Sequence, residues 1–444
     1  MTQSLYQVVI CLLAGIALII WLTARYKLHP FFALLIAGFA VGLGVQLPVS
    51  EVVQVMKDGF GNIMKSLGFI IVLGTALGVL LEHTGSTKVM AAFILQKIGV
   101  RFASLAMAVT GFVVGLPVFC DSGFIVLSGL NTSLAKRTGI KLPVMAVSMA
   151  SGLYAVHCLI PPHPGAAAAA GIIGADYGRL VLTGIGIAIP SMLAGYAWAI
   201  YAGQKNSEED AMPETEEQVD TQKLPSVLQA FLPVLVPVIL IAVRSYLTSD
   251  VHAPLTGIQY LLAAAGDPVI ALTIAVLLTL PGTRCMPPGS LGKSLQEAAE
   301  KAGGILVIIG AGGAFGAILA ATNIGKHLGE VLPLSSLGIL FPFMVAFVLK
   351  TAQGSSTVAI ITAASIVQPL LMPLCLATPD GRLLCVLSMG AGSMMISHAN
   401  DAYFWVIARF QQLEMKTMLK VYSVATVFMG LTALLMVYIL SFLL

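Results

Sequence analysis

The sequence Lys350-Thr-Ala-Gln-Gly-Ser-Ser-Thr-Val-Ala-Ile-Ile361 interrupts a long apolar region in the second half of the chain. It follows the apolar segment 341–349, and its centre, Gln353–Thr357, combines a glycine with amide and hydroxyl side chains. Irregular backbone at membrane depth persists only where it is buried in protein or lines a wet cavity. We therefore expect the tip of a re-entrant hairpin that holds an anion. The alternative is a kinked span whose Lys350 reaches the membrane surface.

The composition indicates a polytopic membrane protein of the all-α class. Hydrophobic residues make up 58% of the 444 residues and charged residues 10%, whereas soluble globular chains carry about 25% charged residues. The net charge of +3, without a basic cluster, gives no indication of a nucleic-acid partner. The six cysteines lie in or near apolar segments without CxxC spacing, so they indicate neither a disulfide framework nor a zinc site.

The apolar pattern predicts membrane spans and two hairpins. A span needs about 20 apolar residues, and the hairpin segments, about 102–139 and 338–373, are too long for one span and carry a polar break. The first span has no basic segment before it and no cleavage site after it, so we expect it to be retained. The spans are expected at about 5–22, 30–47, 60–82, 142–157, 178–202, 226–243, 258–280, 303–321, 384–398 and 421–443.

Charge predicts the orientation of the chain. Lys and Arg concentrate on the cytoplasmic side of membrane proteins. The first residues, to Gln7, carry no charged side chain, whereas Arg25 and Lys27 follow the first span. If both hairpins return to the side they entered from, most of the 23 Lys and Arg residues fall inside. We therefore expect the N-terminus and the C-terminus outside the cytoplasm.

An acidic segment, 204–225, divides the chain into two halves, 1–203 and 226–444. Its carboxylates greatly outnumber its lysines, so we expect a flexible cytoplasmic linker. The hairpin in each half occupies a corresponding place. With five spans each, an odd number, the second half must be inverted relative to the first. Inverted repeats with paired broken segments are typical of secondary transporters.

Short sequence matches support the repeat. Ser148-Met-Ala-Ser-Gly152, which leads to His157, matches Ser388-Met-Gly-Ala-Gly392, which leads to His398. The order of these matches agrees with the charge distribution, which makes compositional chance a poor explanation.

The first half carries two polar breaks. Asp121, in Pro117-Val-Phe-Cys-Asp-Ser-Gly-Phe124, is an acid between apolar runs; low dielectric disfavours its ionised form, so it could exchange a proton, or it caps the second arm of the hairpin. The prolines of His157-Cys-Leu-Ile-Pro-Pro-His-Pro-Gly165 must break a helix. His157 and His163 could carry protons or contact hydroxyls. Their spacing is a weak metal pattern, so we expect no metal.

The second half carries a matching break, Ser397-His-Ala-Asn-Asp401. His398 and Asp401 are three residues apart, which would place both on one face of a helix. They could pair with each other, coordinate a cation or contact the substrate, and Asn400 adds donor and acceptor capacity. The alternative for Asp401 is an ordinary helix cap.

Two further motifs have plainer explanations. Gly310-Ala-Gly-Gly-Ala-Phe-Gly316 lacks dinucleotide-binding spacing, so we interpret it as a site of close helix packing. For Glu82-His83 we expect a solvated pair at the cytoplasmic end of a span rather than a proton relay.

Taken together, three motifs resemble the gluconate permease (GntP) family of bacterial inner-membrane symporters: Pro161–Gly165, Gly354–Ala359, and Ser397–Asp401 followed by Phe404-Trp405. The resemblance runs nearly end to end. It implies the fold of the ion transporter superfamily, with two inverted repeats, two re-entrant hairpins, a homodimer and elevator-type movement. It also implies proton-coupled uptake of gluconate or related sugar acids, and some members take D-serine or short hydroxy acids.

The chain departs from that family at two places. Many gluconate members have Tyr-Glu-Val-Gly-Phe where this chain has Cys120-Asp-Ser-Gly-Phe124, and they have Arg where it has Lys350. Lysine offers a point charge in place of the planar guanidinium of arginine, which can donate two parallel hydrogen bonds to a carboxylate. Both changes leave the exact substrate open.

We predict a proton-coupled symporter of a small hydroxylated monocarboxylate, gluconate first, with no cofactor and no enzymatic activity. The proton-coupling candidates are Asp121, Asp401 and His157. The predicted substrate-binding residues are Lys350, Gly354, Ser355, Ser356 and Thr357 for the carboxylate, and Asp121, Ser122, Gly123, His163, His398 and Asn400 elsewhere. One alternative is a proton- or sodium-coupled carrier of D-serine, glycerate or a dicarboxylate. The other is an intramembrane metalloenzyme.

Overall fold

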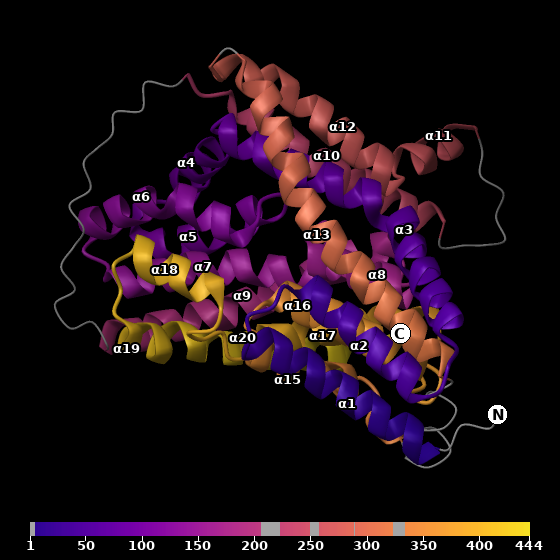
Figure 1. Ribbon diagram of the computed structural model, residues 1–444. Coiled ribbons are helices and arrows are strands. Elements are labelled where there is room, and N and C mark those ends of the chain that lie inside the picture. The colour runs from indigo at the N-terminus through magenta and orange to yellow at the C-terminus, as the bar shows by residue number, and fades with distance from the viewer. Residues whose placement is uncertain (1–4, 206–222, 249–256, 288, 323–333) are drawn as a thin grey trace.

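The computed structural model describes residues 5–205, 223–248, 257–287, 289–322 and 334–444, and this part of the chain is helical throughout, without a strand (Figure 1). Within it, eight helices are long and apolar enough to cross a membrane, or nine if the bent pair 86–98 and 100–115 counts as one span. The predicted class, an all-α polytopic membrane protein, is confirmed. Most of the expected acidic linker 204–225 lies outside the described residues.

The helices of the first half are α1 Leu5–Ala24, α2 Pro30–Gly44, α3 Val49–His83, α4 Ser86–Ile98, η1 Val100–Phe102, α5 Ala103–Gly115, α6 Cys120–Thr138, α7 Leu142–Leu159, α8 Pro164–Ile173 and α9 Tyr177–Lys205. Those of the second half are α10 Val227–Leu247, α11 Gly257–Ala265, α12 Pro268–Thr279, η2 Leu280–Cys285, α13 Ser290–Ala321, η3 Leu334–Ser336, α15 Leu340–Gln353, α16 Ser356–Val367, η4 Gln368–Leu370, α17 Pro379–Met394, α18 Ala402–Phe410, α19 Met415–Met418, η5 Leu419–Ser423 and α20 Val424–Leu440.

One predicted span is two helices. The segment 258–280 breaks between α11 and α12, because Asp267 caps α12 and Pro268 is its first residue. The Asp267 carboxylate accepts a hydrogen bond from the backbone N–H of Val269 at 3.0 Å. Proline is tolerated at the first position of a helix and breaks one that continues through it. The Gly266-Asp267-Pro268 sequence within the predicted span therefore marks the start of a second helix.

The helices α3 and α13 form a long antiparallel pair (Figure 1). At one end, His83 Nδ1 lies 2.7 Å from Ser294 Oγ. Further along, a Cβ added at Gly59 would lie 2.5 Å from the carbonyl oxygen of Gly313. The interpretation of Gly310–Gly316 as a packing motif is confirmed, because only glycine permits this approach.

Each expected hairpin is a pair of helices joined by a short break: hairpin one consists of α5 and α6, and hairpin two of α15 and α16. A Cβ at Gly111 of α5 would lie 2.3 Å from Met149 O of α7, and one at Gly115 would lie 3.3 Å from Leu153 Cα. These contacts show that α5 and α7 run in the same direction, so α6 returns the chain between them. In the second half, Gly392 of α17 approaches Phe343 O of α15 in the same way, with a Cβ at 2.2 Å.

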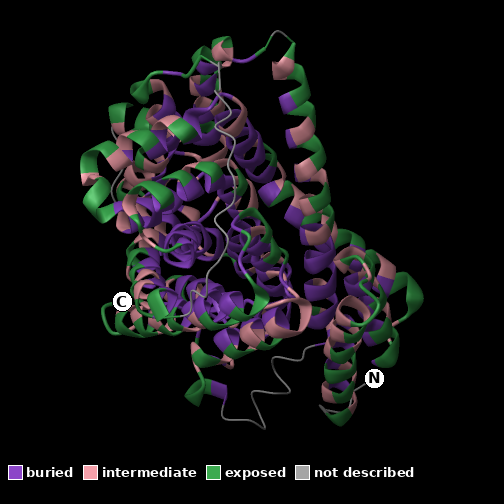
Figure 2. Cartoon of the chain, turned by 90° about the vertical axis from the view of Figure 1, so that its left-hand side faces the viewer, coloured by how far each residue is buried: buried purple, intermediate pink, exposed green. Residues whose placement is uncertain are grey.

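The two halves exchange contacts at their breaks. Helix α8 of the first half packs against α16, and α18 of the second half packs against α6. In the second of these contacts the rings of Phe124 and Tyr403 lie 6.0 Å apart, edge to face. All residues of α7 are buried, and Figure 2 shows buried residues filling the interior. The four breaks, which precede α6, α8, α16 and α18, therefore meet inside the protein.

Candidate functional site

A cavity of about 360 Å³ lies where the breaks meet. This volume falls within the range of about 300–1,000 Å³ found for small-molecule sites. Residues from both halves line it: Phe119, Cys120, Asp121, Tyr154, His157, Pro164, Ile305, Ile308, Gln353, Gly354, Ser355, Ser356, Thr357, Val358, Asn400, Asp401, Ala402 and Tyr403.

Four helices begin at this cavity. Cys120, Pro164, Ser356 and Ala402, the first residues of α6, α8, α16 and α18, all line it. The N-terminus of a helix carries unpaired backbone N–H groups and about half a positive charge. Four such ends around one small space favour a bound anion.

Side chains cap two of these helix starts. The Ser355 hydroxyl accepts a hydrogen bond from the backbone N–H of Val358 at 3.3 Å, and the Asp401 carboxylate accepts one from the N–H of Tyr403 at 3.0 Å. The break in hairpin two and the break before α18 therefore have defined conformations.

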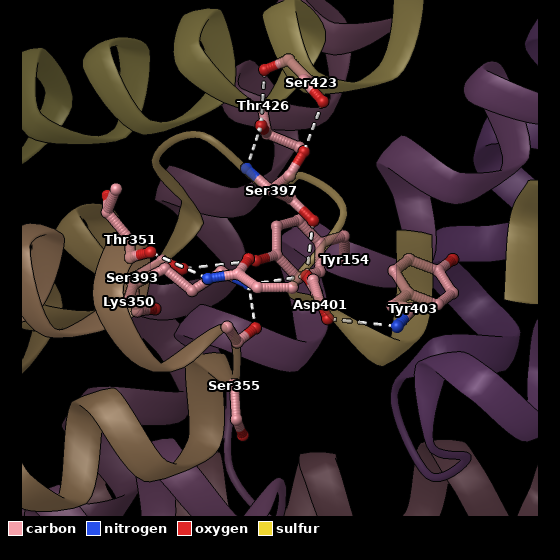
Figure 3. Close-up of polar contacts among 12 residues, drawn as sticks. Tyr154, Lys350, Thr351, Ser355, Ser393, Ser397, Asp401, Tyr403, Ser423 and Thr426 are labelled. Atoms are coloured by element: carbon pink, nitrogen blue, oxygen red, sulfur yellow. Dashed lines mark hydrogen bonds and ion pairs between the residues drawn. The ribbon is translucent and has the colours of Figure 1, made fainter. Parts of the chain in front are cut away.

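A buried ion pair joins Lys350 to Asp401, which lines the cavity (Figure 3). The Lys350 side chain is fully buried, and its Nζ donates to Asp401 Oδ2 and to the carbonyl oxygen of Gly354, both at 2.5 Å. Asp401 Oδ2 also accepts a hydrogen bond from the Ser397 hydroxyl. Lys350 is not among the cavity-lining residues. Its charge is thus neutralised by Asp401, and it ties hairpin two to the loop before α18.

Gly354 makes the closest contact at the tip of hairpin two. Its φ of 84° is in the left-handed region, and an added Cβ would lie 2.1 Å from the backbone oxygen of Asn400. The Asn400 amide in turn donates to Thr351 O at 2.8 Å. The tip can therefore rest on the 397–401 loop only if residue 354 is glycine.

Several buried polar atoms beside the cavity lack a hydrogen-bond partner within the described part of the chain. They are both amide atoms of Gln353, Asn400 Oδ1, His157 Nδ1 and the Tyr403 hydroxyl. Buried polar groups in proteins are nearly always hydrogen-bonded. These cavity-lining residues therefore have hydrogen-bonding capacity that the described part of the chain leaves unused.

The structure brings eight of the predicted residues to the cavity wall: Asp121, His157, Gly354, Ser355, Ser356, Thr357, Asn400 and Asp401. His157 Nε2 lies 3.3 Å from the Thr357 hydroxyl, which joins the first half to hairpin two.

Five predicted residues are not among those that line the cavity: Ser122, Gly123, His163, Lys350 and His398. Gly123 packs on Leu153, which an added Cβ would approach to 2.8 Å. His163 Nε2 lies 2.6 Å from Gly115 O.

The expectation that His398 and Asp401 share one face of a helix is wrong. Helix α17 ends at Met394, and the following residues form turns before α18. The N–H of Asp401 donates to the carbonyl oxygen of His398 at 2.8 Å. The chain is irregular here, as it is in the matching break at 160–163 between α7 and α8.

Several features of the site could not be predicted from the sequence. Gln353 and Tyr403 line the cavity but were not selected, and the pairing of Lys350 with Asp401 was not foreseen. The only signal for the pair was that each is a lone charge of opposite sign beside a polar break in an apolar region. Apolar Ile305 and Ile308 of α13, which close one wall, carried no signal.

Known proteins resemble this chain over almost its whole length. The model of the GntP family permease matches residues 7–443. A gluconate permease of Pseudomonas aeruginosa is 33% identical, with 99% of each chain covered. The high-affinity gluconate transporter of Escherichia coli K12 is 32% identical over 92% of this chain and 93% of its own. The D-serine transporter DsdX of Escherichia coli O6:H1 is 31% identical over 99% of each.

Among solved structures, the chain resembles MtrF of Neisseria gonorrhoeae with a TM-score of 0.62, at 17% identity, over 96% of this chain and 97% of that one. It resembles the YdaH transporter of Alcanivorax borkumensis with a TM-score of 0.61, also at 17% identity, over 89% and 90%. These likenesses show a shared fold.

Proposed function

Because the chain belongs to the GntP family of permeases, we propose that it is a secondary transporter that takes up gluconate, or a related small hydroxylated monocarboxylate, together with protons. The observation that carries this proposal is the cavity of about 360 Å³ at which four helices begin. It offers positive helix ends for one carboxylate and amide and hydroxyl side chains for a polyhydroxylated chain.

The carboxylate is assigned to the start of α16. Ser356 and Thr357 place backbone N–H groups and hydroxyls there, where the helix end favours an anion. Lys350 acts indirectly, because its Nζ is bound to Asp401 and Gly354 O and so fixes the backbone of the hairpin tip. The substrate hydroxyls are assigned to Gln353, Asn400 and His157, which line the same cavity and each have a polar atom without a partner among the described residues.

Asp121 is assigned the coupled proton. Its carboxylate lines the cavity, and its one described hydrogen-bond partner is the Cys120 thiol at 3.9 Å, a weak donor. Asp401, the other acid at the cavity, is neutralised by Lys350. One proton carried with one monoanion moves no net charge, which avoids about 2.3 kcal/mol per 100 mV of membrane potential.

We assign the conformational change that carries the substrate across the membrane to a unit that contains both hairpins. The matching breaks and matching glycine contacts of α5–α7 and α15–α17 support two inverted repeats, 1–203 and 226–444. The α3–α13 pair meets the cavity only through Ile305 and Ile308. An apolar wall of this kind suits elevator-type sliding in a homodimer of the bacterial inner membrane, with both termini outside.

The test is uptake of labelled gluconate into proteoliposomes under an inward proton gradient without sodium. Accumulation above equilibrium, abolished by a protonophore, is expected. Sodium-dependent uptake at fixed pH would overturn proton coupling. Uptake of D-serine, glycerate or a dicarboxylate in place of gluconate would overturn the substrate assignment.

Asp121→Asn is expected to abolish accumulation, because the amide cannot take up or release a proton. The fall should be at least about 10²-fold, the lower range for loss of a proton-transferring group. Asp58→Asn is the matched control, since Asp58 is an exposed acid that bonds only Gln54 among the described contacts. Unchanged accumulation in Asp121→Asn would remove Asp121 from the coupling mechanism.

Gln353→Met is expected to raise the KM for gluconate about tenfold, the effect of losing about 1.4 kcal/mol of binding. The folded protein should be as stable as the wild type or more so, because the lost amide had no partner among the described residues. In the control Gln411→Met, the amide that donates to Ser128 O at 3.1 Å is lost. That variant should lose about 1–3 kcal/mol of stability and keep its KM. A wild-type KM in Gln353→Met would contradict the assignment.

A further inference from the structure

The break between α7 and α8, residues 160–163, contacts both hairpins. His163 ends this break and is the N-cap residue of α8. Its side chain is buried, and its Nε2 lies 2.6 Å from the carbonyl oxygen of Gly115, the last residue of the first arm of hairpin one. Two residues further along the chain, a Cβ added at Gly165 would lie 3.3 Å from Thr357 Cα in hairpin two. One short segment therefore packs against both hairpins.

The contact of His163 with hairpin one involves both sides of the break in that hairpin. Gly115 ends α5 before the break, and Phe119 precedes α6 after it. The rings of Phe119 and His163 lie 6.2 Å apart, edge to face. Phe119 lines the cavity, as do the two residues after it, Cys120 and Asp121. His163 therefore contacts the chain on both sides of the turn that leads to Asp121.

The partner of His163 determines which ring nitrogen carries a hydrogen. A carbonyl oxygen can only accept a hydrogen bond, so Nε2 is the donor to Gly115 O. The last carbonyl groups of a helix have no partner within it, and at membrane depth no bulk water replaces one. A hydrogen on Nε2 is present both in one neutral tautomer and in the charged imidazolium. The bond therefore does not require His163 to gain or lose a proton.

The second half has a corresponding bond at its own break. The Asn400 amide donates to the carbonyl oxygen of Thr351, in the last turn of α15, at 2.8 Å. In each half, a side chain of the break thus donates to a carbonyl group at the end of the first hairpin arm. The two differ in one respect, because Asn400 lines the cavity and His163 does not. The bond of His163 is therefore available for positioning alone.

We propose that His163 is a positioning residue of the transporter. Through its bond to Gly115 O, it holds the tip of hairpin one so that Asp121 lines the cavity at a fixed distance from the start of α16. The inference rests on the proposed function, which assigns the coupled proton to Asp121 of hairpin one and the substrate carboxylate to the start of α16 in hairpin two. His163 itself carries no proton and contacts no substrate.

The experiment compares His163→Phe with His163→Gln in the full-length transporter. Phenylalanine keeps a ring but cannot donate to Gly115 O, whereas the glutamine amide can donate from nearly the position of Nε2. In His163→Phe, accumulation of labelled gluconate under a proton gradient should fall at least about tenfold, because proton transfer depends on the placement of its groups. Gluconate affinity, measured by calorimetry in detergent, should stay at the wild-type value, since the assigned substrate residues lie outside hairpin one. His163→Gln should match the wild type in both measurements at each pH tested.

Amide hydrogen exchange measures the position of hairpin one directly, because it reports local opening of the backbone. In His163→Phe, exchange should become faster at 116–124 and stay unchanged at 353–357. The matched control is His29→Phe. His29 is likewise the N-cap residue of a helix that begins with proline, but it is exposed and its side chain makes no capping hydrogen bond. This control should leave accumulation, affinity and exchange unchanged.

Two results for His163→Phe would overturn the proposal: wild-type accumulation, or equal loss of accumulation and affinity, which would show a general structural role. Loss of accumulation in His163→Gln would also overturn it, because the imidazole itself would then be needed, as in a proton carrier. If His163→Phe does not fold, His163→Gln decides the question alone, and wild-type accumulation at each pH supports the proposal. If the wild-type protein fails to accumulate gluconate under a proton gradient, the proposed function fails, and the exchange rates at 116–124 still show whether His163 positions hairpin one.

Discussion

Asp401→Asn is expected to destabilise the protein by about 3–5 kcal/mol, the usual result of leaving one partner of a buried ion pair unpaired, and to abolish uptake. The Lys350 ammonium would stay fully buried with neutral acceptors such as the carbonyl oxygen of Gly354 and without a negative partner. Asparagine still caps a helix well, so the loss would report on charge and not on the start of α18. The measurements are thermal unfolding in detergent and uptake in proteoliposomes.

The double variant Lys350→Met with Asp401→Asn separates the charge from the shape. Because it removes both charges, it should recover most of the lost stability, whereas each single variant is severely destabilised. The control is Arg179→Met, which breaks the Arg179–Asp380 pair, 2.6 Å long with side chains 34% and 41% exposed. A partly exposed pair contributes about 0–1 kcal/mol. A stable Asp401→Asn would contradict a charged pair in the interior.

Gly354→Ala is the second change with a large expected effect. Alanine in the left-handed conformation costs roughly 1–2 kcal/mol, and its Cβ would meet the backbone oxygen of Asn400 at 2.1 Å. Because the 397–401 loop would have to move, the Lys350–Asp401 pair and the cavity would be distorted together. We expect uptake to be lost even where the variant still folds.

Gly61→Ala provides the comparison for Gly354→Ala. An added Cβ at Gly61, within α3, meets no atom within 4 Å. Alanine in a helix interior is about 1 kcal/mol better than glycine, so this variant should transport normally and unfold no earlier than the wild type. Normal uptake by Gly354→Ala would show that the tip of hairpin two does not need its close contact with the loop.

Much of the fold could be predicted because the bilayer imposes one rule on each segment. A run of apolar residues predicts a span, and a polar break such as 353–357 predicts an irregular tip. The predicted helix starts are wrong where a helix continues through charged residues beyond its apolar part. Helix α3 begins at Val49 and not near residue 60, since Lys57 and Asp58 interrupt the apolar run while the helix continues through them. For the same reason α13 begins at Ser290 and includes Lys293 and Lys301.

The site was predictable in its parts and not in its arrangement. Each break contains a proline, a glycine or a lone charged residue, so residues such as Asp121 and Thr357 could be predicted from the sequence. The direction in which each side chain points depends on how the breaks pack against one another. Lys350 and Asp401 are 51 residues apart, and His157 lies beside Thr357, 200 residues further along the chain. Such choices are decided by packing between distant segments.

The exchange of contacts between α8 and α16, and between α6 and α18, also constrains biosynthesis. When the ribosome has completed the first half, the surfaces of α8 and α6 that later contact α16 and α18 have no partner. The nascent first half must therefore wait in the membrane with its polar breaks uncovered until residues beyond 400 have been inserted. A chain halted at the linker would be a natural target for quality-control proteases, and two halves supplied as separate polypeptides would have to find each other before either could complete its core.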